Sequence, residues 1–365
     1  MITRVNYNRG RRFLNPLEIE AQYITEDRAT NPDLLLWIDF TDKNSLRGIT
    51  SGGMNIVSNG EGIMVAQNKS FYPDVANAGM VSAGDKALSS AVFQTDSSKC
   101  PTYIEPANGV PYALFSGNDF MHAMGSLGRA SATDFSTSDL DVNKFTAYFV
   151  CQRLNPSTPG RQDVFFLTTN DFSVNNVPEV FASFYFADLD GGGGTSYDGT
   201  FEMYDASLAA GSRYRYVKYD EPDDGQFHYH MFNAYENYNN SSNYGSLQAD
   251  GVFHQFTESY DYNKISSPGF GMLDGSSGTL SNTFDFSGTS TYHSSITIGG
   301  QPQFGTSIAP KGTFVGKIYE ILLFKSEHAG PNFVDVLFFS KTFKRRWSNM
   351  LYYFQRKYQY INPKI

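Results

Sequence analysis

The sequence predicts an all-β protein: an antiparallel β-sandwich with an extended N-terminal arm and a C-terminal amphipathic helix. Aromatic residues make up 16% of the chain, with 24 Tyr and 31 Phe, whereas charged residues make up only 18%. Aromatic residues favour strands, and the abundant Gly, Ser, Asn and Asp favour the turns that join them. Many short segments also alternate with a period of two, which indicates strands rather than helices. At 365 residues the chain can form one large β domain or two small ones.

The segment that best defines the fold is residues 312–325, "GTFVGKIYEILLFK". A period of two predicts two apolar faces: Phe314, Ile318, Leu322 and Phe324 on one, and Val315, Tyr319, Ile321 and Leu323 on the other. A strand that is apolar on both faces belongs in the middle of a sheet or between two sheets. Glu320 is a single charge within this apolar strand. Residues 295–300 predict a second strand, which two glycines end.

The remaining strands follow from alternation and turn residues. Strands are predicted over residues 33–42, 144–153, 164–168, 180–187, 201–204 and 251–258, and a strand–turn–strand unit over 110–121 with its turn at Gly117-Asn118. Residues 214–219 and 226–232 alternate on either side of an acidic turn, which predicts a hairpin. Residues 43–109, 233–246 and 266–290 are interpreted as largely polar connections.

The two ends differ from the middle. Residues 1–30 have no periodicity and predict an extended arm, with a disordered tail as the alternative. Residues 31–330 form the sandwich, and 331–365 a helix with a basic tail. The helix is predicted over 332–357, because apolar residues recur at spacings of three and four: Val336, Phe339, Phe343, Trp347, Met350 and Phe354.

Charge is distributed unevenly along the chain. The net charge of −9 and the pI near 5.2 argue against nucleic acid as the main partner. Both ends are nevertheless basic: no acidic residue follows Lys341, and the first twelve residues contain Arg4, Arg9, Arg11 and Arg12. This asymmetry predicts that the arm anchors the protein on an acidic partner surface, the alternative being two solvated ends.

Cys100 and Cys151 are too few for a disulfide framework; reduced thiols are expected, with one bridge as the alternative. No apolar run reaches the ~18 residues that cross a membrane, so membrane insertion is not expected. The first residues lack the apolar core of a signal peptide. The sequence therefore predicts folding in a cytoplasm.

In four places the chain resembles a concanavalin A-like, laminin-G type jelly roll. The matching segments are "LLLWIDFTD" (34–42), "GVPYALFSGNDFM" (109–121), "KFTAYFVCQR" (144–153), and "SITIGG" with "FVGKIYEILLFK" (295–325). The Lys-Tyr of "QRKYQYI" (355–361) matches the ending that often follows in this family. The resemblance implies a jelly-roll sandwich. It leaves function open, since this fold carries lectins, hydrolases, lyases and scaffolds.

Versions of this fold with large loops, an arm and no secretion signal look most like structural proteins of bacteriophages. The resemblance implies a virion subunit: a capsid decoration protein, a head fibre or a tail-associated protein. Its partners would be other virion proteins and further copies of itself. A carbohydrate-binding adhesin that recognises host surface polysaccharide is the alternative, and a polysaccharide-degrading enzyme a third reading.

Catalytic motifs are absent from the sequence. Glycoside hydrolysis needs two facing carboxylates, and laminarinase-like relatives place theirs as Glu-x-Asp-x-x-Glu on one strand. No such string occurs; "FEMYDAS" contains only Glu202 and Asp205. The sequence therefore predicts a protein that is not an enzyme.

Two sets of residues could bind a metal, although no cofactor is expected. Asp188 and Asp190 precede four glycines and indicate either a calcium-loop fragment or an ordinary acidic turn. His228 and His230 share one strand face, and His254 could approach from a neighbouring strand. The alternative is solvated or core histidines.

The most suggestive binding surface is a segment rich in Tyr and Asn between residues 235 and 244. Tyr235, Tyr238, Tyr244 and Asn239 are the candidate contacts, because tyrosine rings stack on sugars and also dominate protein interfaces. A loop packed over its own domain by these aromatics is the alternative.

Overall fold

The computed structural model describes a discontinuous set of residues. These are 34–50, 53–69, 91–94, 96–124, 140–141, 145–154, 161–168, 180–187, 198–205, 214–220, 226–237, 242–249, 252–254, 283–284, 294–300, 313–324 and the helical positions 350, 353, 354, 357 and 358. The predicted arm, residues 1–30, lies outside this set.

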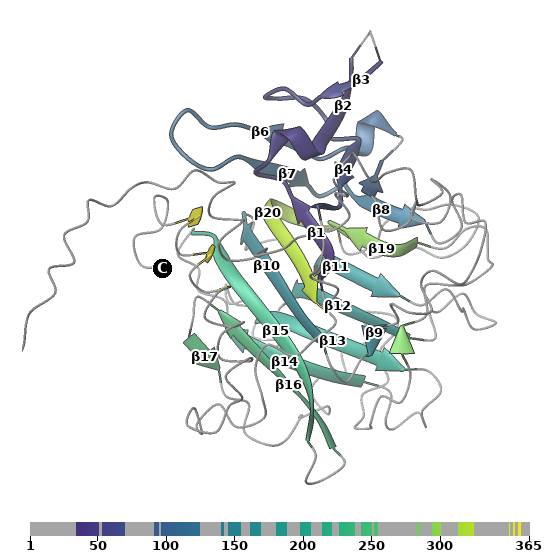
Figure 1. The fold of residues 1–365 in the computed structure, drawn as a ribbon. Coiled ribbons are helices and arrows are strands. Elements are labelled where there is room, and N and C mark those ends of the chain that lie inside the picture. Colours follow the sequence, from purple (N-terminus) through teal and green to yellow (C-terminus); the bar gives the residue numbers. More distant parts are fainter. Residues whose placement is uncertain are drawn as a thin grey trace, which may run out of the picture.

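One sheet has eight strands in the order β17-β16-β15-β10-β20-β7-β6, and β1 also pairs with β20 (Figure 1). Every pairing is antiparallel. The strands are β1 (Leu34–Asp39), β6 (Thr102–Ile104), β7 (Tyr112–Ser116), β10 (Phe145–Arg153), β15 (His228–Asn237), β16 (Ser242–Ala249), β17 (Val252–His254) and β20 (Val315–Phe324).

The other large sheet has ten strands in the order β14-β13-β12-β11-β19-β8-β5-β4-β2-β3. Its strands are β2 (Leu46–Thr50), β3 (Gly53–Ile56), β4 (Val65–Gln67), β5 (Ala91–Phe93), β8 (Met121–Met124), β11 (Gln162–Thr168), β12 (Val180–Ala187), β13 (Asp198–Asp205), β14 (Tyr214–Asp220) and β19 (Ser294–Ile298). A two-stranded sheet, β9 (Leu140–Asp141) with β18 (Thr283–Phe284), and two short 3-10 helices, η1 (Lys43–Ser45) and η4 (Ser97–Lys99), complete the described elements.

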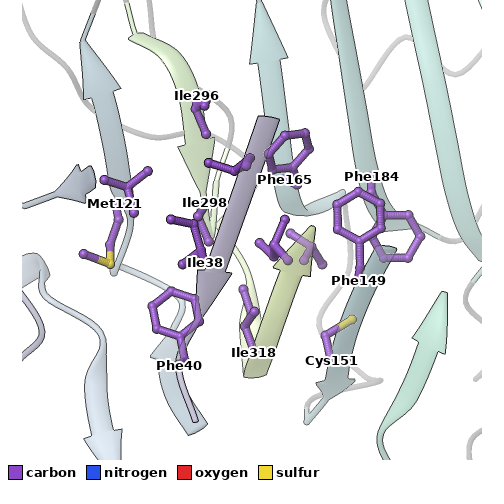
Figure 2. Close-up of a cluster of buried hydrophobic side chains, with 14 of the residues drawn as sticks. Ile38, Phe40, Met121, Phe149, Cys151, Phe165, Phe184, Ile296, Ile298 and Ile318 are labelled. Carbon is purple, nitrogen blue, oxygen red and sulfur yellow. The ribbon is translucent and has the colours of Figure 1, made fainter. Parts of the chain in front are cut away.

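The two large sheets pack face to face around a core that both supply. Figure 2 shows Phe149 of β10 against Phe184 of β12, with ring centroids 4.7 Å apart and nearly parallel planes. Met121, Ile298 and Ile318 belong to the same buried cluster. The all-β antiparallel sandwich predicted from the sequence is therefore confirmed.

Successive strands repeatedly change sheets, as in jelly rolls, and this corrects the predicted hairpin. Strands β7 and β8 flank Gly117, which has the expected left-handed φ of 95°, but they lie in different sheets. Strand β14 pairs with β13 while β15 pairs with β10, so the predicted hairpin does not form. Strands β19 and β20 also lie in separate sheets. The turn residues correctly predicted where the chain reverses direction. They did not predict which strands pair, because the chain can also reverse while crossing from one sheet to the other.

Residues 43–109 contain strands that the sequence did not reveal. β2 to β6 are three to five residues long, which is too short to show a clear period of two. A prediction of one long polar connection there was wrong.

β20 lies between β10 on one side and both β1 and β7 on the other, so the prediction of a central two-faced strand is confirmed. The assignment of its faces was partly wrong. A register shift opposite Val150 and Cys151 interrupts the alternation near Tyr319. Ile318 and Ile321 therefore share the inter-sheet core, while Tyr319 and Leu322 belong to the other cluster.

That second cluster covers the outer face of the eight-stranded sheet. Helical residues Met350, Tyr353, Phe354 and Tyr358 pack there with side chains of β1, β10, β15 and β20. Burial of Met350 and Phe354 agrees with the predicted apolar stripe. Cys100 and Cys151 are free and buried, as expected. No helix in the described part of the chain is long and apolar enough to span a membrane.

Candidate functional site

The predicted tyrosine loop is in part a β-hairpin, which corrects its assignment as a connection. β15 and β16 pair over eight positions, and the backbone register places Tyr235 opposite Tyr244. β10 accompanies β15 only as far as Ala234, so the last three hairpin pairs, from Tyr235 to Asn237, extend past this neighbouring strand. Figure 1 shows β15 and β16 running past the neighbouring strand ends at the bottom of the view.

Several other predicted site residues lie outside the described residues. These are Tyr238 and Asn239 at the hairpin end, Asp188 and Asp190, and the arm residues Arg4, Arg9, Arg11 and Arg12.

The candidate histidine pair lies in the core. His228 and His230 are both buried, and the His230 ring packs 4.9 Å from Phe184 and 5.9 Å from Phe186. Burial, helped by the neighbouring His228, lowers the pKa of His230, so its neutral form is favoured. Among the described residues no group of three His, Cys, Asp or Glu side chains could hold a metal ion.

A buried charged centre occupies the outer face of the eight-stranded sheet. Asp39 of β1 and Glu320 of β20 are paired across the two strands, and both are fully buried. Lys357, from the C-terminal helical residues, places its Nζ 2.9 Å from Asp39 Oδ2 and 3.1 Å from Glu320 Oε2. Lys69 Nζ donates to Asp39 Oδ2 at 3.0 Å. The two carboxylates therefore share one ammonium group.

Neutral donors occupy the remaining oxygens. Trp37 Nε1 and Tyr353 OH donate to Glu320 Oε1 at 2.7 Å and 2.5 Å. Tyr358 OH donates to Glu320 Oε2 at 2.7 Å. Thr41 donates to Asp39 Oδ1 from both its backbone N and its Oγ1, at 3.0 Å and 2.6 Å. Each carboxylate is thus saturated within the protein, as buried charges require.

The two carboxyl groups respond differently to this environment. Burial would raise the pKa of Asp39, but the charges of Lys357 and Lys69 outweigh it and hold the pKa well below its usual range. Burial raises the pKa of Glu320 and Asp39 adds to the rise, while Lys357 opposes it. Asp39 is therefore the ionised partner of the lysines, and Glu320 is the group more readily protonated.

The residues of this centre lie in the segments that resemble jelly-roll motifs. Trp37 and Asp39 come from "LLLWIDFTD", Glu320 from "FVGKIYEILLFK", and Lys357 and Tyr358 from the Lys-Tyr ending. Sequence reasoning noted Glu320 as an isolated charge but did not connect it with the others. These residues join the C-terminal helical residues to the outer face of the eight-stranded sheet.

A second buried charged centre joins three strands of the ten-stranded sheet. Arg161 donates to Asp163 through Nε and Nη2, at 2.9 Å and 2.8 Å, and through Nη1 to Glu202 of β13 at 3.1 Å. Its Nη2 also donates to Ser183 Oγ at 2.7 Å. Tyr185 OH donates to Glu202 Oε2 at 2.9 Å, and the guanidinium lies 3.8 Å from the centroid of the Tyr185 ring.

Two neighbouring carboxylates in a sandwich raise the question of glycoside chemistry. Burial and the nearby Glu202 raise the pKa of Asp163 to about 6, against the opposing charge of Arg161. Both Asp163 oxygens accept from Arg161, and both Glu202 oxygens accept from protein donors. Asp163 and Glu202 are fully buried as well. These contacts suit a cross-link between strands, whereas hydrolysis needs carboxyl groups that face a substrate and a water.

No protein-family model matches this chain, and a search of curated proteins finds no match either. Among solved structures, the botulinum neurotoxin serotype D binding domain is similar at 10% identity and a TM-score of 0.36, over 81% of this chain and 49% of that one. The chain therefore spans about half the length of that domain. A leech intramolecular trans-sialidase is similar at 12% identity and a TM-score of 0.32, over 59% and 25%.

A glycoside hydrolase family 16 endo-glucanase from Bacteroides ovatus is similar at 10% identity and a TM-score of 0.27, over 64% of this chain and 74% of that one. These are partial likenesses between β-rich chains. The function of this chain is therefore argued from its own residues.

Proposed function

We propose that this protein is a non-catalytic binding and display subunit, whose sandwich presents the β15–β16 hairpin to surface polysaccharide. The observation that carries the proposal is the hairpin itself: Tyr235 and Tyr244 are directly opposed where the hairpin extends past β10. Residues opposed in an antiparallel ladder occupy one face and lie about 5 Å apart. A pair of tyrosines at opposed positions can stack on sugar rings, and Asn side chains can supply hydrogen bonds.

The absence of a catalytic role is part of the same proposal. The four fully buried carboxylates of the two charged centres accept hydrogen bonds from protein donors, and the neighbouring tyrosine hydroxyls are among these donors. Such saturation supports a rigid scaffold, since a catalytic acid or base must reach the reacting atoms.

The setting that fits best is a bacteriophage virion, with the sandwich facing outward from a capsid or tail. The supporting feature is the charge distribution, in which basic residues 4, 9, 11 and 12 precede an acidic protein with a net charge of −9. A basic arm on an acidic domain can bind an acidic particle surface while the domain itself is repelled from it. Its partners would then be other virion proteins.

The direct test is a glycan and polysaccharide binding screen on the full-length protein, with and without a calcium chelator. Binding should be saturable, unaffected by chelation, and lost in the Tyr235→Ala and Tyr244→Ala variants. The matched control is Glu236→Ala with Asn243→Ala, a pair opposed on the other face of the same hairpin. Equal loss in the control pair, or full binding by both tyrosine variants, would refute the proposed platform.

A further inference from the structure

The edge strand β3 exposes apolar side chains. β3 ends the ten-stranded sheet and pairs only with β2 in the described chain; Figure 1 shows this hairpin at the top of the view. All four of its residues are exposed. Met54 is 60% exposed and Ile56 48%, and they are two of the three large apolar residues exposed among the described residues, with Leu154 at 41%.

The backbone hydrogen bonds show which groups of β3 face outward. Val57 N donates to Leu46 O at 3.4 Å, so residues 57, 55 and 53 belong to the hydrogen-bonded pairs with β2. Arg47 O accepts instead from Met64 N at 2.8 Å, on the other side of β2. By this alternation, the backbone N–H and C=O of Met54 and Ile56 point away from β2, toward the side on which β3 pairs with no other described strand.

The sequence of β3 lacks the features that usually prevent an edge strand from pairing with another chain. Natural edge strands are usually protected by charged side chains, proline or a bulge. The sequence of β3 is Gly-Met-Asn-Ile, without charge or proline, and its register with β2 is unbroken over four pairs. An edge with outward backbone groups and exposed apolar side chains is suited to pairing with another strand.

We propose that β3 pairs antiparallel with β3 of a second copy of this chain, about a two-fold axis through Asn55. In this register Met54 of each copy lies opposite Ile56 of the other, so the apolar side chains of the two copies contact each other on one face. The outward backbone groups of these two residues form the hydrogen-bonded pairs. The contact is isologous, as in most homodimers.

A second copy is the partner that the strand itself selects. Shifting the register by two residues in either direction moves the two-fold axis to Met54 or Ile56 and breaks the mutual Met54–Ile56 pairing. The net charge of −9 makes copies repel each other, and an uncharged strand brings no like charges together at the axis. A four-residue edge buries less than the ~1,200 Å² of standard interfaces, so the dimer is weak and concentration-dependent.

The first experiment is sedimentation velocity on the full-length chain over a wide concentration range. A monomer–dimer equilibrium is expected, and Ile56→Lys should raise its dissociation constant at least ~10-fold, about 1.4 kcal/mol. Leu154→Lys is the matched control, since it also charges an exposed apolar residue and should leave dimerisation unchanged. A wild-type chain that stays monomeric throughout, or an equal effect of Leu154→Lys, would overturn the proposal.

Cysteine cross-linking tests the register. Asn55→Cys puts two thiols opposite each other across the axis, with Cα atoms about 4.5 Å apart, within the range of a disulfide. Ile56→Cys places its two thiols diagonally, about 7–8 Å apart, which is too far to bridge. Mild oxidation should therefore give a covalent dimer for Asn55→Cys alone. Faster cross-linking of Ile56→Cys would overturn the two-fold axis at Asn55. The natural thiols are buried and give the baseline.

Discussion

Glu320 joins three distant parts of the chain through its two oxygens. Trp37 comes from β1, Glu320 from β20, and Tyr353, Lys357 and Tyr358 from the C-terminal helical residues. Each of these donors gave up its hydrogen bonds to water when it was buried. The buried carboxylate therefore stabilises the fold only while all of its donors are present.

Glu320→Ala should therefore lower the free energy of unfolding by about 3–5 kcal/mol, since it leaves Lys357 and three neutral donors without their acceptor. Urea denaturation followed by tryptophan fluorescence measures the loss. The control is Glu105→Ala, which breaks an exposed ion pair with Lys43 at 3.5 Å and should cost at most about 0.5 kcal/mol. A loss below about 1 kcal/mol for Glu320→Ala would contradict this role.

His122 gives the stability a defined pH dependence. The ring is buried between Phe93 and Phe120, and its Nδ1 has no hydrogen-bond partner in the described part of the chain. Burial lowers the pKa of His122 to about 4, against about 6.5 in the unfolded chain. As the pH falls from 6.5 to 4 the unfolded state binds the proton first, so stability falls.

The loss at pH 4 should reach roughly 3 kcal/mol, from about 1.4 kcal/mol per pKa unit. The measurement compares the wild type with His122→Gln from pH 8 to pH 4, because the difference between them isolates this group from other titrations. The difference in the free energy of unfolding between the two proteins should be constant above pH 7. As the pH falls, the wild type should lose stability relative to the variant. A difference that stays constant over this range would rule out the assigned pKa.

Among the elements, the C-terminal helical residues act as the cover of the eight-stranded sheet. Tyr148 of β10 packs 5.5 Å from Phe354, and Tyr229 of β15 stacks on the same ring at 5.3 Å. These residues also deliver Lys357 to the buried centre. Their apolar stripe therefore packs on its own domain.

Ending the chain after residue 349 should expose this apolar face and leave both buried carboxylates without Lys357. We expect increased binding of a hydrophobic dye and aggregation, because the exposed patch would hold Trp37, Tyr148 and Phe324. A chain ending after Tyr358 is the control, since it keeps every contact described here. A soluble, dye-silent protein ending at residue 349 would contradict the role of the cover.

At the scale of the whole molecule, one core of described residues spans both sheets, and the predicted arm lies outside the described residues. Attachment through the arm is a prediction from the sequence, and a deletion tests it.

Deleting residues 1–30 should leave the melting temperature of the sandwich within a few degrees and abolish its attachment to virus particles. Co-sedimentation with particles that lack the protein measures attachment, and circular dichroism measures folding. Replacing only the four arginines of the arm by glutamine tests whether charge is responsible. Attachment that survives the deletion would refute anchoring by the arm.

The sequence determined which segments are strands wherever the apolar pattern was strong and long. β1, β10, β12 and β20 were predicted within a few residues, as was the central position of β20. The short strands β2 to β6 and the polar β16 were missed, because few or polar residues carry little periodicity. Period and turn chemistry are local properties, so a sequence displays them directly.

Tertiary structure alone decided which strands pair, where β20 loses its alternation, and what surrounds Glu320. The Trp37–Glu320 hydrogen bond joins residues 283 positions apart, and the Lys357–Asp39 bond joins residues 318 apart. No local pattern encodes such contacts, because they form only when distant strands of one sheet and the helical residues packed on it bury charges together. The isolated charge in an apolar strand was the visible sign of that centre, and only the fold supplied its partners.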